Sequence, residues 1–374
     1  MLLLRLLPCV LVLLAGCASL PAHESAPPQF AVSEVSGTFL GRAANAALPA
    51  GDPQLSGYRL LADGPAAFDT RVELARRAQV SIDAQYYLIA DDPIGRRFLR
   101  ALRDAAGRGV RVRLLVDDLY AAGHDELLAG LSAFPNVQVR LYNPLPVRAG
   151  STVTRLLLSL HEFSRINRRM HNKLLIADNS FAVLGGRNIA DEYFMSSAQA
   201  NFIDLDVLSC GPVVRELSSV FDAYWNSDQV YPVGQLTAPG SRERFDSRVG
   251  EAHERSDEHE PDMLGATSLA QQLDSGALTL AFGRGNVFTD APDKRAGPTV
   301  TDRTLNLFAD SRDEVIIASP YFIPGDRGMA LIRAAGATNE NGRVTLITNS
   351  FGSSDELLAF RSYARYRKDM LRAG

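Results

Sequence analysis

The sequence predicts an α/β fold with a central sheet, because short apolar strands alternate with amphipathic helices along most of the chain. A second observation predicts two lobes: the strand-then-helix pattern of the first half recurs in the second. The chain has 374 residues, of which 46% are hydrophobic and 22% charged. This composition is ordinary for a globular protein, and the length allows two domains.

The first lobe is predicted over residues 54–231. Its first strand, 79–87, ends in the aromatic pair Tyr86 and Tyr87. The apolar periodicity then predicts a helix at 94–107, a strand at 110–116, a helix at 124–133, a strand at 137–141, a helix at 155–164, and strands at 172–178 and 181–184.

Residues 232–274 are polar and are predicted to link the two lobes. A second, partial lobe is predicted over 275–374. There the strand 314–322 repeats strand 79–87, with Tyr321 in the place of Tyr86. A helix at 332–337 and a strand at 343–349 follow, and residues 355–372 look helical. A duplication explains this order better than two unrelated units.

The N-terminal residues 1–16 are predicted to be a signal peptide, because Arg5 precedes an apolar run that is too short to span a bilayer. The run ends in Leu-Ala-Gly-Cys17, which resembles a bacterial lipobox and implies lipidation of Cys17. A plain secretory signal is the alternative. Residues 17–53, rich in Ala, Pro, Ser and Gly, are predicted to be a tether. We therefore expect a membrane-anchored lipoprotein of a bacterial envelope. It would face the periplasm, and Ala18 favours the outer membrane.

Charge and cysteine content narrow the class of protein. The net charge is −4, so no nucleic-acid partner is expected. Between residues 144 and 173, however, several basic residues are opposed by Glu162 alone: Arg148, Arg155, Arg165, Arg168, Arg169 and Lys173. They form either a solvated helix face or an anion-attracting rim, and their position before His171 favours the rim. With Cys9 removed and Cys17 acylated, Cys210 alone would be free, which excludes an internal disulfide and a cysteine zinc site.

The most informative stretch begins at His171. His171 and Lys173 would share one face of a strand, setting a nucleophile or proton carrier beside a positive charge. Gly185 and Gly186 end the next strand, where glycine lets the backbone approach a phosphate. Taken singly, each feature also fits a surface histidine or an ordinary turn. Together, in this order, they favour a phosphodiester site.

Further polar residues complete this pattern. Asn188 can donate a hydrogen bond to phosphate oxygens. Asp204 and Asp206 would share one strand face, where a carboxylate could fix the histidine tautomer. They could equally be an exposed face paired with arginines. Asp178 is a candidate catalytic residue or a residue that holds the strand turn together.

The pattern His171-x-Lys173-x4-Asp178-x6-Gly185-Gly186-x-Asn188 resembles the signature of the phospholipase D superfamily, known as the HKD motif. Four surrounding segments resemble its bacterial cardiolipin synthase C-like branch: 81–87, 165–173, 204–207 and 363–367. The resemblance implies a bilobal α-β-α sandwich with one motif in each lobe, here with a complete first lobe and a partial second one.

The resemblance also implies roles for individual residues. His171 would attack phosphorus to form a phosphohistidine, and Asp204 would orient it. Lys173 and Asn188 would hold the phosphoryl oxygens. The other residues that we assign to phosphate or substrate binding are Gly185, Gly186, Tyr86 and Arg169. No metal or cofactor is expected, because fixed cations and amides stabilise the charge.

The activity implied is a phosphatidyltransferase that makes cardiolipin from phospholipids, with phosphatidylglycerol and phosphatidylethanolamine as candidate substrates. A hydrolytic phospholipase D and an inactive lipid-binding fragment are the alternatives. The second alternative arises from the repeat, in which Asn349 stands in the place of Asp117. His171 follows Asp117 by 54 residues, and the same spacing after Asn349 would put the second histidine near residue 403. We therefore expect the chain to be cut before its second motif. His253 and His259 lack a lysine two residues on, so neither is expected to substitute.

Overall fold

The computed structural model describes residues 19–23, 27–250, 261–293, 298–337, 343–354 and 356–373. The chain forms two compact units, Met1–Val287 and Phe288–Gly374. The predicted signal peptide, Cys17, His253 and His259 lie outside the described residues.

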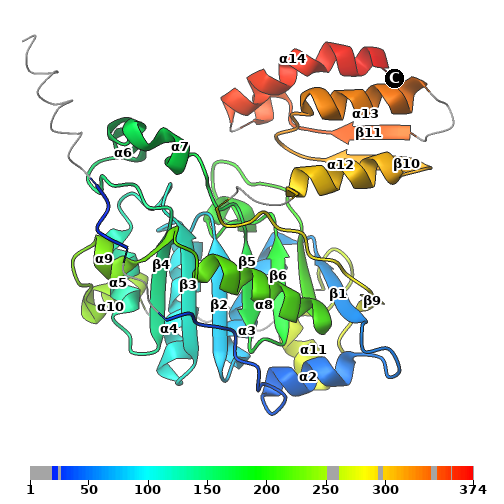
Figure 1. Ribbon diagram of the computed structural model, residues 1–374. Coiled ribbons are helices and arrows are strands. Elements are labelled where there is room, and N and C mark those ends of the chain that lie inside the picture. Colours follow the sequence, from blue (N-terminus) through cyan, green and yellow to red (C-terminus); the bar gives the residue numbers. More distant parts are fainter. Residues whose placement is uncertain are drawn as a thin grey trace, which may run out of the picture. The chain divides into compact units, whose positions relative to one another are not determined.

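The first unit is built on a nine-stranded sheet with the order β8-β4-β3-β2-β5-β6-β7-β1-β9 (Figure 1). Strands β2, β3 and β4 are parallel, and the other neighbouring pairs are antiparallel. The strands are β1 Ser56–Leu61, β2 Ser81–Tyr86, β3 Arg111–Asp117, β4 Val137–Tyr142, β5 Leu174–Ala177, β6 Phe181–Gly185, β7 Asp206–Cys210, β8 Val230–Pro232 and β9 Ala281–Gly283. The predicted α/β fold with a central sheet is therefore confirmed.

Helices cover both faces of this sheet (Figure 1). Helices α3 (Gly64–Arg77), α4 (Pro93–Gly107) and α5 (Asp125–Ser132) lie on one face, and α8 (Pro212–Trp225) lies on the other. The side chains of β5 alternate between the two layers: Leu175 and Ala177 join the core of the first face, whereas Leu174 and Ile176 pack with α8. Burial on both faces explains why β5 and β6 are almost continuously apolar. The neighbouring strands β2 and β3 instead bury Asp83 and Arg113, which pair with each other at 2.6 Å.

Local sequence determines where α3 and α4 begin. Asp63 and Asp92 cap α3 and α4 by accepting hydrogen bonds from the N–H groups of Ala66 and Gly95. A proline in the first turn suits both helices, because its missing N–H is not needed there. In α4, apolar residues at helical spacing turn one stripe to the core: Ile94, Phe98, Leu99, Leu102 and Ala105.

The remaining helices of this unit are short. They are α2 Phe39–Ala47, α6 Thr152–Leu158, η1 Leu160–Glu162, α7 Phe163–Ile166, η2 Asp191–Phe194, α9 Val233–Leu236, α10 Arg242–Val249 and α11 Leu269–Ser275. The helix predicted at 155–164 is thus three short pieces. Buried Arg155 and exposed Leu157 in α6 do not follow an ordinary apolar-inward pattern.

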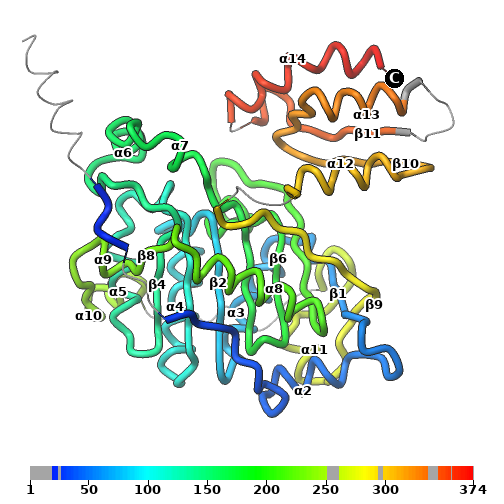
Figure 2. Tube along the Cα trace, in the orientation of Figure 1, coloured from blue at the N-terminus to red at the C-terminus, as the bar shows by residue number. Residues whose placement is uncertain are grey.

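The described part of the predicted tether, 17–53, is not a free linker. Leu40 and Ala44 of α2 are buried in the main core. Before α2, the backbone N–H groups of Gln29 and Ala31 donate to Asn226 and to Asp222 of α8, each at 2.9 Å. Figure 2 shows this blue segment running along the sheet layers to α2. A few apolar and hydrogen-bonding residues therefore dock a segment whose composition resembles a linker.

The predicted lobe boundary is also wrong. Residues 232–274 were expected to link the lobes, but their helices α9, α10 and α11 pack on the first unit. Phe245, Val249, Leu269 and Leu273 are buried in its main core. β9 then adds an edge strand beside β1, so the first unit continues to Val287. A few widely spaced apolar residues thus dock the described parts of this stretch, 232–250 and 261–274, on the first unit.

The second unit contains α12 (Val300–Asp310), β10 (Glu314–Ala318), α13 (Gly325–Ala337), β11 (Arg343–Ile347), η3 (Phe351–Ser353) and α14 (Leu357–Ala373). β10 and β11 are parallel, as in the β2–β3 pair of the first unit. Met329, Ile332 and Met370 form its small core. The strand-helix-strand order predicted from the repeat is confirmed.

Candidate active site

One end of the large sheet gathers most of the predicted site residues. The parallel strands β2, β3 and β4 finish at this end, β6 finishes there, and β5 and β7 begin there. We call it the site edge. It brings together the residues next to Tyr86, Asp117, Gly185 and Asp206, and the segment just before Leu174. His171 and Lys173 belong to that segment.

His171 and Lys173 meet on the ring of Tyr87. β5 begins only at Leu174, so the two residues precede the strand rather than sharing its face. The Tyr87 and His171 rings are 4.7 Å apart in an edge-on arrangement. Lys173 Nζ lies 5.4 Å from the Tyr87 ring centre and donates a hydrogen bond to the His171 carbonyl oxygen at 2.9 Å. The imidazole is exposed and the ammonium group is buried beside it.

The charge of Lys173 is held in a buried, acidic setting. Burial lowers the pKa of Lys173 to about 8, against the opposing effects of Asp204, Asp117 and Asp206. Burial also raises the pKa of Asp204, which Lys173 lowers in turn. Lys173 is therefore cationic at neutral pH and close enough to its titration range to respond to mild alkali.

The two glycines accommodate carboxylates. A Cβ on Gly186 would lie 2.1 Å from Asp204 Oδ1, and a Cβ on Gly185 would lie 2.1 Å from Asp206 Oδ1. Real side chains do not approach so closely, so glycine is required at both positions. The expectation that these glycines make room for a phosphate stays a prediction. In the structure the space is occupied by the two aspartates.

Asp204 and Asp206 do not share one strand face as predicted, because β7 begins at Asp206. Asp206 is fully buried and forms ion pairs with Arg71 Nη2 at 3.0 Å and Arg187 Nη1 at 3.2 Å. Arg187, inside the Gly-Gly-Arg-Asn stretch, also donates to the Leu61 and Ala62 carbonyls. Asp206 and its arginines thus anchor the backbone, whereas Asp204 is half-buried and interacts with Lys173. Sequence reasoning missed both arginines.

Tyr86 is not a substrate contact in this structure. Its side chain is fully buried, and its hydroxyl accepts a hydrogen bond from Arg71 Nε at 3.1 Å. Strand alternation directs neighbouring side chains to opposite faces, and Tyr87, one residue later, is the aromatic that reaches His171. The sequence correctly indicated the aromatic pair at the end of β2. We assigned the substrate contact to Tyr86, whereas Tyr87 is the one that contacts His171.

Asp178 lies at the opposite end of β5. Its carboxylate accepts hydrogen bonds from the backbone N–H groups of Gln79, Val80 and Ser81 at 2.8–3.1 Å, at the start of β2. Asp178 is five residues along the chain from Lys173, which in an extended strand is about 16 Å. These hydrogen bonds favour the turn-holding alternative over the catalytic assignment. Asp178 and Asn179 both have positive φ, which suits the tight β5–β6 turn.

The side chain of Asn188 forms hydrogen bonds within the protein. It is almost fully buried, its Oδ1 accepts from the Leu88 N–H at 3.2 Å, and its Nδ2 donates to the Tyr193 hydroxyl at 2.9 Å. The predicted donation to phosphate oxygens stays a prediction. In the structure Asn188 holds the backbone immediately after Tyr87.

Asp117 is a site-edge residue that sequence reasoning did not select. Its carboxylate accepts from the Met170 N–H at 2.8 Å and pairs with Arg169 Nη1 at 3.1 Å. Burial raises the pKa of Asp117 to about 6. Asp117 therefore fixes the backbone just before His171, and Arg169 is committed to this pair rather than open to a phosphate. The position of Asp117 at the end of an apolar strand could have indicated a site residue.

The predicted anion-attracting rim is largely neutralised. Arg148 and Arg155 pair with Asp118, and Arg165 pairs with Glu162. Of the five arginines before His171, Arg168 is the one with no acidic partner within 4.0 Å in the described part of the chain. Acidic residues distant in sequence supplied the partners, so local charge counting overestimated the rim.

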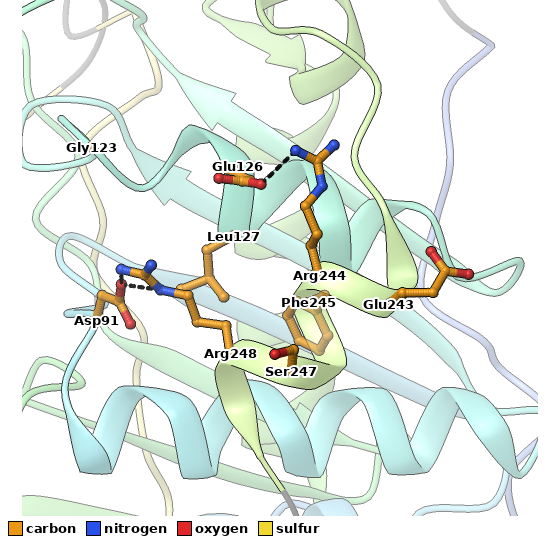
Figure 3. A pocket seen from close by; sticks show the side chains of 9 residues that line it. All are labelled: Asp91, Gly123, Glu126, Leu127, Glu243, Arg244, Phe245, Ser247 and Arg248. Atoms are coloured by element: carbon orange, nitrogen blue, oxygen red, sulfur yellow. Dashed lines mark hydrogen bonds and ion pairs between the residues drawn. The ribbon is translucent and has the colours of Figure 1, made fainter.

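Other features of the structure are weaker candidates for an active site than the site edge. A pocket between α5 and α10 is lined by paired charges, Arg248 with Asp91 and Arg244 with Glu126, and contains none of the predicted site residues (Figure 3). Within the described ranges, no group of three His, Cys, Asp or Glu side chains could hold a metal ion. Among the helices that the structure describes, none is long and apolar enough to cross a bilayer.

The chain resembles known proteins over most of its length. A family model described as "Cardiolipin synthase, PLD-like domain" matches residues 72–225. Cardiolipin synthase C of Escherichia coli is 35% identical over 317 residues, which are 82% of this chain and 66% of that protein. An uncharacterized protein of Helicobacter pylori is 30% identical over 330 residues, 86% of this chain and 65% of the relative. The chain thus spans just under two thirds of the length of these two relatives.

A solved structure shares the fold. The crystal structure of phosphatidylserine synthase from Haemophilus influenzae matches with a TM-score of 0.54 and 12% sequence identity, covering 91% of this chain and 74% of that one. At this identity the match concerns the arrangement of strands and helices alone.

Proposed function

Because this chain belongs to the phospholipase D superfamily, we propose that it is part of a phosphatidyltransferase that makes cardiolipin by transphosphatidylation, with His171 as the nucleophile. The observation that carries the proposal is the cluster of His171, Tyr87 and Lys173 at the site edge. It combines an exposed imidazole with a buried cation beside it, as nucleophilic attack on an anionic phosphodiester requires.

In the proposed first step, an imidazole nitrogen of His171 attacks the phosphorus of phosphatidylglycerol. A nitrogen–phosphorus bond forms, the bond from phosphorus to the headgroup oxygen breaks, and glycerol leaves after its oxygen takes up a proton. In the second step, a hydroxyl of another phosphatidylglycerol attacks the phosphohistidine and loses its proton. The products are cardiolipin and free His171. Phosphatidylethanolamine is a second candidate donor, with ethanolamine as its leaving alcohol.

Residues around His171 support these steps in different ways. Lys173 would stabilise the charge on the phosphoryl oxygens, because its ammonium group is buried and held near His171. Asp204 lies close to Lys173 and would orient the imidazole. The family reaction uses a second histidine to protonate the leaving alcohol, and this sequence contains one His-x-Lys pair.

The proposal includes a lipid anchor at Cys17 that holds the protein on the periplasmic side of the bacterial envelope, on the outer membrane. Tethering would raise the local concentration of a bilayer substrate. Incorporation of labelled palmitate into the chain, lost in Cys17→Ser, tests the anchor. Equal labelling of both proteins would refute it.

The activity is tested by expressing the protein from its own gene in cells that lack other cardiolipin synthases. Labelled phosphatidylglycerol is followed into cardiolipin. We expect cardiolipin with the natural sequence and none with His171→Ala. Phosphatidic acid with no cardiolipin would favour the hydrolase instead. Cardiolipin from the His171→Ala protein would refute the proposed nucleophile.

A further inference from the structure

We infer that the segment α6–η1–α7 is a membrane-docking surface that seats the site edge on a phospholipid bilayer. Four apolar side chains form this docking face: Val153, Leu157, Leu160 and Phe163. The inference rests on the proposed function, which places the substrate in a bilayer. It goes beyond the lipid anchor because it assigns a second, folded contact with the membrane.

The docking face reverses the usual amphipathic pattern, because its apolar side chains are exposed and its arginine is buried. Val153, Leu157, Leu160 and Phe163 are 65%, 60%, 53% and 59% exposed. Val153 and Leu157 are four residues apart in α6, so they point to the same side of that helix. Leu160 and Phe163 follow in η1 and α7. The buried side of α6 carries Arg155 instead, which is fully buried and donates to Asp118 Oδ2 at 2.6 Å and to the Val147 carbonyl at 3.0 Å. A helix with its arginine inward and Val153 and Leu157 outward is arranged for an apolar environment outside the protein.

The docking face is fixed relative to His171. The Asp118 carboxylate that holds Arg155 comes directly after β3. Asn143, directly after β4, donates through Nδ2 to the Arg165 and Arg168 carbonyls at 2.8 and 2.9 Å. Figure 1 shows α6 and α7 beyond the strand ends, outside the two helix layers. Contact of this face with a bilayer would therefore bring the site edge to the lipid headgroups.

Charge next to the docking face favours an anionic bilayer over a protein partner. Arg168 follows α7 and has no acidic partner within 4.0 Å in the described ranges. Along the chain it lies between Phe163 of the docking face and His171. The apolar side chains match the hydrocarbon interior of an anionic bilayer, and the basic residue beside them matches its headgroups. Fully exposed Ile203, next to Asp204, adds an apolar side chain beside the site.

The N-terminal segment reaches the same end of the sheet. His23 Nε2 lies 3.1 Å from the Val230 carbonyl oxygen, and its ring packs edge-on against Tyr231 at 5.1 Å. Val230 pairs with Tyr142, the last residue of β4, so His23 lies at the site edge. The proposed anchor, Cys17, is six residues before His23, a reach of at most about 20 Å. Anchor and docking face can thus contact one bilayer together.

The test places a fluorophore on the docking face and measures its contact with lipid. Leu157→Cys is labelled with an environment-sensitive dye, and the full chain is reconstituted on vesicles of phosphatidylglycerol and brominated phosphatidylcholine. Phe30→Cys is the matched control: Phe30 is 65% exposed, and its carbonyl accepts from Arg111, at the other end of β3. The unsubstituted chain measures background labelling at Cys17 and Cys210; Cys210 is buried, and burial raises its pKa to about 11.

We expect brominated lipid to quench the dye at position 157 at least twofold and to leave the dye at position 30 unquenched. Equal quenching at both positions, or none at 157 with the protein on vesicles, would overturn the inference. Shielding of position 157 from both brominated lipid and aqueous iodide would also overturn it, because a second copy or another protein segment would then cover the face.

A second measurement separates this inference from the proposed function. Phe163→Glu is compared with Phe30→Glu, which places the same charge at a similarly exposed phenylalanine. We expect Phe163→Glu to lower turnover of vesicle phosphatidylglycerol about tenfold, with turnover of a monomeric short-chain substrate unchanged. Equal losses in both variants would contradict docking. If no variant turns over lipid, the proposed function fails, and the quenching result still decides the docking face.

Discussion

The two ends of β5 carry parts of one sequence motif and have different surroundings. At the site edge, His171 is exposed and Lys173 is buried on the Tyr87 ring. At the other end, Asp178 is fully buried and accepts three backbone N–H groups from the start of β2. One sequence motif can therefore span a whole strand. The residues before β5 are proposed to carry the chemistry, and the residue after β5 holds the strand to its neighbour β2.

The largest expected effect is at the exposed end. His171→Ala should lower cardiolipin formation by about 10⁴-fold or more, because it removes the proposed nucleophile. Thermal unfolding should be nearly unchanged, since the imidazole is exposed. Arg215→Ala, which removes an exposed side chain of α8, is the control and should keep its activity. Comparable losses in the two variants would contradict the assignment.

Lys173→Met should lower the rate of the chemical step by about 10²–10³-fold, because a fixed cation beside the phosphoryl oxygens is lost. Single-turnover kinetics with short-chain phosphatidylglycerol would measure this step. The methionine side chain retains much of the apolar packing on Tyr87. A rate within threefold of the natural protein would show that Lys173 has a structural role alone.

At the buried end, the effect should fall on stability instead. Asp178→Ala leaves three backbone N–H groups without their acceptor, so the free energy of unfolding should drop by about 3 kcal/mol. Urea denaturation measures the change. The folded fraction should keep its activity per molecule. If activity falls as far as in Lys173→Met while stability is unchanged, the contrast between the two ends of β5 is wrong.

Gly186→Ala should have a smaller effect, about tenfold on activity, because the new methyl group would displace the Asp204 carboxylate. Gly107→Ala is the matched control, since a Cβ there meets nothing within 4 Å. Similar activity in both variants would show that the position of Asp204 is unimportant to the reaction.

The smallest effect concerns pH. The pKa of Lys173 is about 8, and its cationic form is the one proposed to act. The charge is complete well below pH 8 and is lost above it, so activity should fall about twofold at pH 8 and about tenfold at pH 9. Lys173→Arg should abolish this alkaline decline in whatever activity it retains. An unchanged decline in Lys173→Arg would assign it to another group.

Much of the fold could be predicted because strand and helix periodicities are strong in this chain. The strand pairs on either side of His171 and the repeat in the second unit follow directly from apolar spacing. The docking of 27–53, of 232–250 and of 261–274 could not be predicted. Those segments contribute few apolar residues, and their attachment depends on long-range partners such as Asp222 and Asn226.

The candidate site was predictable in its location and less so in its details. The His-x-Lys pair and the glycines identified the correct end of the sheet. Tyr86 was chosen over Tyr87 because a shift of one residue reverses the direction of a strand side chain. Asp178 was placed near the phosphate because spacing along the chain does not show which end of a strand a residue occupies. Asn188 does lie at the site edge, but its hydrogen bonds to Leu88 and Tyr193 could not be read from the sequence.

Trapping the covalent intermediate tests the central claim most directly. The protein would be mixed with short-chain phosphatidylglycerol, quenched rapidly in alkali, digested and analysed by mass spectrometry. We predict a phosphatidyl adduct on the peptide that contains His171, present in Asp178→Asn and absent in His171→Ala. An adduct on another residue, or one that persists in His171→Ala, would contradict the account.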